Sequence, residues 1–256
     1  MRVALAQLRS TTDPAANLRA VADWARRAAE GGADLVVFPE ATMCSFERAS
    51  AEVAEPADGP WAGAVRGLAS ELGVTIAVGM FTTAPNGRVC NTLLVAGAAE
   101  ARYDKVHLFD ALGHRESDHI APGAELVSVD LAGTSVGLTV CYDVRFPEQF
   151  RTLAAGGAQV ILVAASWAPG PEKTRQWTTL ATARAMDSTA FVVAVDQAAA
   201  GDPERPGRPT GVGHSMVIEP TGRVLLELGT AEELAFVDID PTAASAVRMA
   251  LPVLSG

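Results

Sequence analysis

The chain is short of cysteine and of basic residues. Its 256 residues include only three cysteines, Cys44, Cys90 and Cys141, which are far apart and form no C-x-x-C pair. This number and spacing exclude a zinc-ribbon type of metal site and a disulfide framework. Twenty basic residues stand against 30 acidic ones, a formal net charge of −10. Nucleic acid and anionic membranes bind basic surfaces, so neither is expected as a partner.

Long apolar runs are also missing. No stretch is long enough to span a bilayer, and the chain opens directly on the strand-like segment Met1–Ala6. A charged segment followed by an apolar run, the pattern typical of a signal peptide, does not precede it. We therefore expect a cytoplasmic protein, in a reducing compartment that keeps a reactive thiol usable.

Predicted helices and strands alternate along the chain. Helical spacing and proline or glycine ends predict helices at Pro14–Glu30, Trp61–Leu72, 147–155 and Glu172–Asp187. Short apolar runs predict strands, among them Val3–Gln7, Asp34–Phe38, Val74–Met80, Cys90–Ala96, Glu100–Tyr103, Val127–Leu131, Ser135–Val140, 159–164, Phe191–Val195, Met216–Ile218, Val224–Leu228 and Ala235–Ile239.

The character of these strands indicates the architecture. Near-continuous apolar strands are typical of sheets covered on both faces, whereas the hairpin turns between others indicate antiparallel pairs. We therefore expect an α/β fold, a four-layer α-β-β-α sandwich of two mixed sheets with helices outside. Periodicity alone leaves an ordinary three-layer sheet open. No linker or repeat divides the chain, so residues 1–256 are expected to form a single domain.

Cys141 lies at a predicted strand-to-helix corner. It follows the apolar run Ser135–Val140, and Pro147 then opens the predicted helix. Backbone N–H groups and the helix dipole favour negative charge at such a corner, so we expect a lowered thiol pKa and a nucleophile. The alternative is a cysteine buried in the core, which is common.

A thiol nucleophile needs a base. Glu40 follows the predicted strand Asp34–Phe38, and Lys105 follows the strand that ends near Tyr103. A carboxylate, an amine and a thiol at three strand ends could converge at one mouth of the sheets. A cysteine–histidine hydrolase is the alternative, with the base among His107, His114, His119 and His214.

Three segments together resemble the signature of the carbon–nitrogen hydrolase (nitrilase) superfamily. They are Phe38-Pro39-Glu40, Tyr103-Asp104-Lys105-Val106-His107-Leu108 and Cys141-Tyr142-Asp143-Val144-Arg145-Phe146-Pro147-Glu148. Their order and spacing match the family as well, and the resemblance runs from Val3 to about Asp240. The set is far more specific than any one of its motifs.

The resemblance implies a catalytic triad that uses neither cofactor nor metal. Glu40 matches the general base, and Cys141 matches the nucleophile that carries the acyl group as a thioester. Lys105 matches the cation that stabilises the tetrahedral intermediate, together with a backbone N–H near Tyr142. Glu116 stands where a second glutamate often follows the lysine and holds it. A solvated loop acid is the alternative for Glu116.

The residues beside Cys141 favour an amide substrate. Members that hydrolyse nitriles typically carry tryptophan and glutamate after the cysteine, and here the residues are Tyr142 and Asp143. This is similar to the Nit subgroup of amidases, which act on ω-amides of small 2-oxo acids and on deaminated glutathione. Hydrolysis of a carbamoyl group or a nitrile remains an alternative, as does a catalytically silent binding protein of the same fold.

A carboxylate-bearing amide would need a cation in the pocket. Arg145 and Arg115 are candidates, because an arginine can donate two hydrogen bonds to a carboxylate. Arg145 could instead pair with Glu148 and hold the corner together. The residues expected to bind substrate are Tyr142, Arg145, Phe146 and Trp167, although core packing is the more common role for a tryptophan at a position such as Trp167.

The resemblance also bears on assembly. Members of the family are homo-oligomers, so a homodimer or a larger homo-oligomer is expected. The helices predicted over 147–155 and 172–187 could form its interface. The loop 201–213 is rich in glycine and proline and could border the entrance to the pocket.

Overall fold

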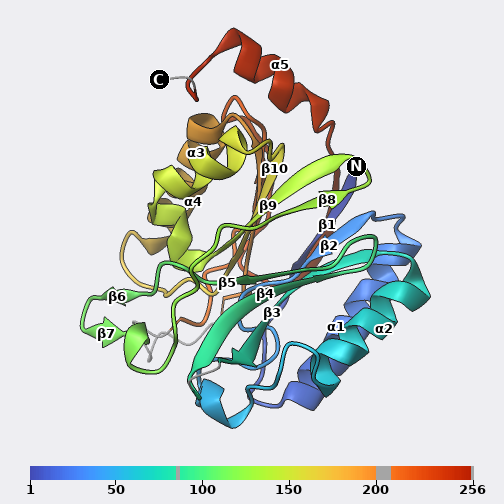
Figure 1. Ribbon diagram of the computed structural model, residues 1–256, viewed down its shortest axis with the longest axis vertical. Helices are drawn as coiled ribbons and strands as arrows, with labels where there is room; N and C mark the ends of the chain where they lie inside the picture. The colour runs from blue at the N-terminus through green and yellow to red at the C-terminus, as the bar shows by residue number, and fades with distance from the viewer. Residues whose placement is uncertain (85–86, 200–208, 255–256) are drawn as a thin grey trace.

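Two mixed sheets of six strands each form the centre of the protein, which is seen here as a computed structural model describing residues 1–84, 87–199 and 209–254. The loop expected at the pocket entrance, 201–213, lies outside the described residues except for 209–213. The two sheets pack face to face, and helices cover the outer face of each (Figure 1). The expected four-layer α-β-β-α sandwich is therefore confirmed.

The first sheet has the order β14-β1-β2-β3-β4-β5, and the second has the order β13-β12-β11-β10-β9-β8. The strands of the first sheet are β1 (Arg2–Gln7), β2 (Leu35–Val37), β3 (Thr75–Thr83), β4 (Val89–Ala96), β5 (Ala101–Asp104) and β14 (Glu233–Asp238). Those of the second are β8 (Ser128–Leu131), β9 (Thr134–Val140), β10 (Val160–Ala165), β11 (Phe191–Asp196), β12 (Met216–Ile218) and β13 (Val224–Glu227). A separate ribbon pairs β6 (Asp110–Ala111) with β7 (His114–Arg115).

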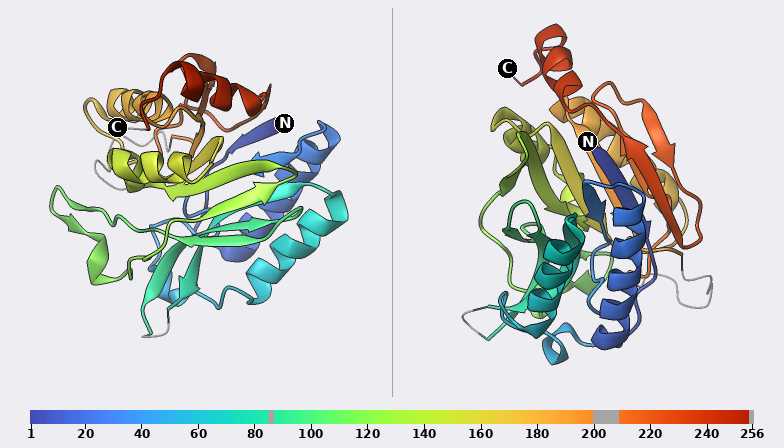
Figure 2. Two further views of the ribbon diagram at one scale, coloured as in Figure 1. Left: turned by 45° about the horizontal axis from the view of Figure 1, so that its top comes forward. Right: turned by 90° about the vertical axis from the view of Figure 1, so that its right-hand side faces the viewer.

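Helices α1 (Pro14–Glu30) and α2 (Pro60–Leu72) cover the first sheet, and α3 (Pro147–Ala155) and α4 (Lys173–Ser188) cover the second (Figure 2). Side chains from both sheets form one apolar core between them, and a second core lies between the first sheet and its helices. The helix α5 (Thr242–Ala250) lies beyond the end of α3 in Figure 1, where Arg248 contacts Thr189 and Ala158. No helix in the described part of the chain is both long and apolar enough to cross a membrane.

Local signals explain why the helices begin and end as they do. Asp13 caps α1 by accepting a hydrogen bond from the N–H of Ala15, Pro14 occupies the first turn, and Gly31 ends the helix. The bounds predicted for α1 and α3 match the structure, α2 begins one residue before its predicted start, and α4 is displaced by one residue at both ends. The prediction missed α5, the β6–β7 ribbon and three short 3-10 helices, η1 (Ser50–Glu52), η2 (Glu116–Asp118) and η3 (Cys141–Arg145).

The direction of the strands places the site. Strands β1, β2 and β3 run parallel in one sheet, and β9, β10 and β11 run parallel in the other. Parallel strands present their carboxyl ends at the same edge, which is where α/β proteins hold ligands. The segments that follow β2, β9, β10 and β11 carry Glu40, Cys141, Ser166 and Gln197.

Candidate active site

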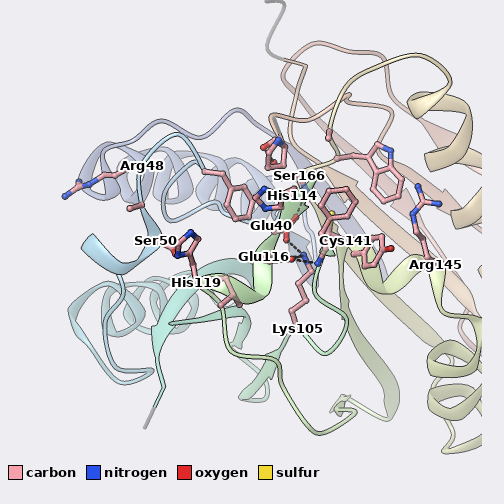
Figure 3. Close-up of a pocket in the computed structure, with 18 of the residues that line it drawn as sticks. Glu40, Arg48, Ser50, Lys105, His114, Glu116, His119, Cys141, Arg145 and Ser166 are labelled. Carbon is pink, nitrogen blue, oxygen red and sulfur yellow. Dashed lines mark hydrogen bonds and ion pairs between the residues drawn. The ribbon is translucent and has the colours of Figure 1, made fainter. Parts of the chain in front are cut away.

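A cavity of about 380 Å³ opens at these strand ends. Glu40, Lys105, Cys141 and Glu116 all lie on its wall, so the structure brings together the four residues that the sequence singles out (Figure 3). Glu40 comes from the loop after β2, Lys105 from the segment after β5, and Cys141 from the end of β9. Each of these four side chains is buried.

Lys105 is held between two carboxylates. Its Nζ lies 3.0 Å from Oε1 of Glu40 and 2.9 Å from Oε2 of Glu116. The amide of Asn91, on β4, donates to Oε1 of Glu40 at 2.7 Å and to Oε1 of Glu116 at 3.2 Å. Glu116 also accepts the N–H of Phe109 at 2.7 Å. Glu116 is thus a buried partner of Lys105, and the alternative of a solvated loop acid is wrong.

This arrangement keeps the lysine charged. Burial alone would lower the pKa of Lys105, but the negative charges of Glu116 and Glu40 outweigh it and raise that pKa well above the ordinary value of 10.5. The pKa of Glu116 is lowered in turn, because Lys105 and the hydrogen bonds it accepts outweigh its burial. The site therefore holds a permanent cation beside the thiol.

The second oxygen of Glu40 faces the other sheet. Its Oε2 accepts the backbone N–H of Ser166 at 2.8 Å, and Gln197 Nε2 donates to the main-chain oxygen of Glu40 at 2.9 Å. The next residue, Ala41, has a left-handed backbone with φ of 56°. Glu40 is thus fixed from both sheets, which leaves little freedom for its carboxylate.

Cys141 begins η3 with φ of 48°, in the left-handed region where a side chain other than glycine's is strained. The expected lowering of its thiol pKa is wrong. Burial and, after it, the negative charge of Glu40 raise the pKa well above 9.0, although Lys105 and the N–H of Ser166 act in the opposite direction. Desolvation of the thiolate outweighs the backbone dipoles at the corner. The resting thiol is neutral, so it needs a base before it can attack.

Asp143 connects the cysteine corner to the lysine segment. Its Oδ2 accepts the N–H of Val140 at 2.8 Å and the hydroxyl of Tyr103 at 2.7 Å. Its Oδ1 accepts the backbone N–H of His107 at 3.0 Å and lies 2.9 Å from the ring Nδ1 of the same residue. Tyr103 and His107 flank Lys105 in the chain, so this buried carboxylate fixes Lys105 relative to Cys141.

The expected substrate-binding residues divide into two groups. Tyr142, Arg145 and Trp167 line the cavity, whereas Phe146 stacks on the ring of His107 at 3.6 Å and is not part of the lining. Arg145 donates to Oε1 of Gln176 at 2.8 Å, so the pairing with Glu148 is wrong.

Arg115 is not a wall of the cavity. It is exposed on the β6–β7 ribbon, and its guanidinium lies 3.6 Å from Asp118. Of the two arginines considered for a substrate carboxylate, only Arg145 lines the cavity.

The histidines have other roles. His107 contacts Asp143, and His214 lies 2.9 Å from Glu227. His114 and His119 lie on the cavity wall, but no hydrogen bond within the described residues joins any histidine to Cys141. The geometry therefore favours Glu40 over a histidine as the base.

Sequence reasoning missed several residues of the site. Asn91 and its neighbour Thr92 are polar residues inside an otherwise apolar strand, and that interruption was a usable signal. Asp196 ends β11 and accepts the N–H of Trp167 at 2.8 Å and that of Val212 at 2.7 Å. Lys173 lines the cavity from the start of α4. Nothing in the sequence distinguishes Lys173 from a solvated helix residue.

The comparisons with known proteins each cover nearly the whole chain. A family model described as carbon-nitrogen hydrolase matches residues 2–249. A hydrolase of Mycobacterium tuberculosis is 52% identical over 265 residues, covering 99% of this chain and 94% of the relative. The deaminated glutathione amidase of Escherichia coli O157:H7 is 31% identical, covering 100% of this chain and 96% of the relative.

A solved structure is similar over the same length. It is a CN-hydrolase superfamily protein of Xanthomonas campestris with an arsenic adduct in its active site. Its TM-score is 0.87 at 30% sequence identity, covering 100% of this chain and 97% of the other. The likeness therefore includes both sheets and every segment that lines the cavity.

Proposed function

The chain belongs to the carbon–nitrogen hydrolase family, and from that premise we propose that it is a cysteine-dependent amidase for a small carboxylate-bearing amide. The substrate is of the deaminated glutathione type or an ω-amide of a 2-oxo acid. The products are the free acid and ammonia or an amine. The observation that carries the proposal is the Glu40–Lys105–Glu116 cluster on one wall of a cavity with Cys141.

In the first half of the reaction, Glu40 takes the proton from the Cys141 thiol as the sulfur attacks the amide carbonyl carbon. The carbonyl electron pair moves to oxygen, where Lys105 and a backbone N–H near Tyr142 stabilise the negative charge. When the intermediate collapses, the C–N bond breaks and Glu40 returns the proton to the leaving nitrogen. The acyl group is then a thioester on Cys141.

In the second half, water replaces the amine. Glu40 takes a proton from the water as its oxygen attacks the thioester carbon, and the C–S bond breaks when this second intermediate collapses. The proton returns to the sulfur, and the acid leaves. Because burial raises the pKa of Cys141, its sulfur is protonated again once the C–S bond has broken.

Glu116 acts in this mechanism by holding Lys105. Its carboxylate contacts the lysine Nζ through both oxygens, at 2.9 and 3.2 Å, and accepts the N–H of Phe109. A lysine held at three points is pre-organised for charge that develops in the transition state. Glu116 is thus a positioning residue for Lys105.

The preference for an amide has two supports. Tyr142 and Asp143 follow the cysteine, as in the Nit subgroup, and a relative that is 31% identical is a deaminated glutathione amidase. For the carboxylate, the guanidinium of Arg145 lines the cavity and no carboxylate within the described residues pairs with it. An arginine in this state can donate to a substrate carboxylate.

The test is a release assay over amides, carbamoyl amino acids and nitriles, measuring ammonia, amine and carbon dioxide. We expect amides with a carboxylate to be the best substrates, and Cys141→Ala to remove turnover of all of them. Cys44→Ala, a change at a buried cysteine outside the cavity, is the matched control and should keep activity. Trapping of an acyl group on Cys141 by mass spectrometry tests the thioester directly.

Other results of the same assay would overturn the proposal. Carbon dioxide release or faster turnover of nitriles would indicate a carbamoylase or a nitrilase. Absence of turnover and of an acylated Cys141 would indicate a silent binding protein. Undiminished turnover by Cys141→Ala would remove the mechanism.

We further propose that residues 1–256 form one domain and that the protein works in the cytoplasm as a homodimer or larger homo-oligomer. A reactive thiol suits a reducing compartment, and the family model covers residues 2–249 without a break. None of the steps above requires a cofactor or a metal ion.

A further inference from the structure

Five side chains form a closed ring of contacts on the cavity wall, which we call the collar. Its members are Trp167, Arg145, Tyr142, Phe109 and Lys173, and all five line the cavity. Arg145 lies 5.1 Å from the ring centroid of Trp167 and 5.8 Å from that of Tyr142. Tyr142 meets Phe109 edge to face at 5.0 Å. Lys173 closes the ring, with its Nζ 5.9 Å from both Phe109 and Trp167.

The collar contains two positively charged side chains, Arg145 and Lys173, and no carboxylate among its members compensates their charge. Within the described ranges, neither Arg145 nor Lys173 forms an ion pair with a carboxylate, and the only hydrogen bond from either charged group is that of Arg145 to the neutral Gln176. Burial and the charge of Arg145 lower the pKa of Lys173 below its usual 10.5. Lys105 differs, because two glutamates compensate its charge. Like charges in a partly buried wall are unfavourable unless an anion joins them.

The two cations occupy different parts of the collar. They share Trp167, but the second ring beside Arg145 is Tyr142, whereas the second ring beside Lys173 is Phe109. Each cation can therefore meet its own anionic group. The three aromatic rings between them offer an apolar surface suited to the methylene groups of a short chain.

We propose that the collar selects amides that carry two carboxylates, one held by Arg145 and the other by Lys173. This inference rests on the proposed function, since it names the substrate class of that amidase. The two carboxylates could both belong to the acyl group, or one could belong to the leaving amine. In either case Lys173 is a substrate-binding residue that sets specificity and takes no part in proton transfer.

The test compares four amides of matched length: a neutral one, one with a single carboxylate on the acyl group, one with two carboxylates there, and one with a carboxylate on each side of the amide. Lys173→Met keeps the length of the side chain but removes its charge. We expect it to raise KM for one of the dicarboxylates about tenfold, the usual worth of a charged hydrogen bond. KM for the neutral and singly charged amides should change less than about twofold. Which dicarboxylate responds identifies where the second carboxylate lies.

Two further variants serve as controls. Lys173→Arg keeps the charge and should retain most of the preference for dicarboxylates. Arg175→Met removes a positive charge from the same turn of α4, but Arg175 is exposed, pairs with Glu172 and does not line the cavity. It should leave KM for every amide unchanged.

An equal effect of Lys173→Met on singly and doubly charged amides, or no effect on either, would overturn the inference. Binding of mono- and dicarboxylic acids to the wild type and to Lys173→Met, measured by calorimetry, tests the collar without turnover. If the wild type hydrolyses no amide, the proposed function fails, yet the calorimetric comparison still decides whether the collar holds two carboxylates.

Discussion

Asp196 is a buried carboxyl group whose protonation changes near neutral pH. Burial raises its pKa to about 8, although the N–H groups of Val212 and Trp167 that it binds act in the opposite direction. Through these two bonds Asp196 fixes the segment that follows β10, where Ser166 contacts Glu40. The residue therefore supports the site without facing the substrate.

The raised pKa predicts how Asp196 affects stability. An unfolded aspartate ionises near 3.8, whereas the folded residue stays protonated until about pH 8. Its contribution to the free energy of unfolding is therefore complete below pH 3.8 and declines as the pH rises toward 8. In the variant Asp196→Asn this side chain cannot ionise. The free energy of unfolding of the wild type, minus that of the variant, should therefore decrease steadily between pH 5 and pH 8. Urea unfolding at several pH values measures this difference.

Comparing the two proteins at each pH cancels the titration of all other groups. A difference that stays constant from pH 5 to pH 8 would contradict the assignment of this titration to Asp196. The variant also places an amide N–H against a backbone N–H that donates to a carboxyl oxygen of Asp196 in the wild type, so it should be less stable than the wild type at pH 5.

At the scale of elements, β3 touches the loop that carries Glu40. A Cβ added to Gly79 would lie 2.5 Å from the main-chain oxygen of Pro39 and 2.7 Å from both Cα of Glu40 and the nitrogen of Ala41. Real Cβ atoms do not approach backbone so closely, so Gly79→Ala must displace the loop. The strand thus sets the position of the Glu40 carboxylate by having no side chain there.

We expect Gly79→Ala to lower kcat/KM by about a hundredfold, because a shift of about 1 Å in a catalytic group costs that much. Steady-state kinetics and a thermal unfolding curve should be measured together. Gly67→Ala, in the middle of α2 with open space around the added methyl group, is the control and should keep full activity with equal or higher Tm. Normal kinetics in Gly79→Ala would show that the loop yields without moving Glu40.

The elements also show what a sequence can predict and what it cannot. Proline and glycine marked the helix ends, so α1 and α3 were predicted to the residue. The three motifs placed Glu40, Lys105 and Cys141 at strand ends. An apolar run and the residue that ends it can both be recognised within a few neighbouring residues of the sequence. The raised thiol pKa, in contrast, depends on burial and on Glu40, which lies 101 positions away in the printed sequence. No local pattern could reveal it.

The same reason explains the residues that were missed. Asn91 matters because it reaches Glu40 and Glu116, and Lys173 matters because it meets Phe109 and Trp167. These partners are distant in sequence and are brought together only by the packing of two sheets. The helix α5 has proline at its N-cap position, which offers no capping side chain, and its first N–H is bound instead by Asp240 at 3.0 Å.

At the scale of the whole molecule, α4 carries a large apolar side chain that the described residues leave partly uncovered. Met186 is 52% exposed there. A second copy of the chain could cover this methionine. This supports the proposed homo-oligomer, with α3 and α4 at its interface.

We expect sedimentation equilibrium to give at least twice the 26.5 kDa of one chain. Met186→Glu should shift the population toward 26.5 kDa, because it places a charge in an apolar interface. Leu112→Glu is the control, since Leu112 is also apolar and is more exposed than Met186 but lies between β6 and β7. A wild type that sediments as a single chain would refute the oligomer. An equal shift in molecular mass by both variants would show that the effect of Met186→Glu is not specific to an interface at α4.

The pairing of β1 with β14 has a consequence for biosynthesis. These strands join in register from Arg2 opposite Asp238 to Gln7 opposite Glu233, so the first sheet receives its edge strand from a segment far later in the sequence. A nascent chain on the ribosome therefore exposes an open β1 edge until β14 has emerged, a hazard for aggregation. Glu40 emerges early, but the sheet that positions it closes only once β14 is available. The enzyme should acquire activity only after β14 has been translated, and a chaperone that shields the early β1 edge would raise its yield.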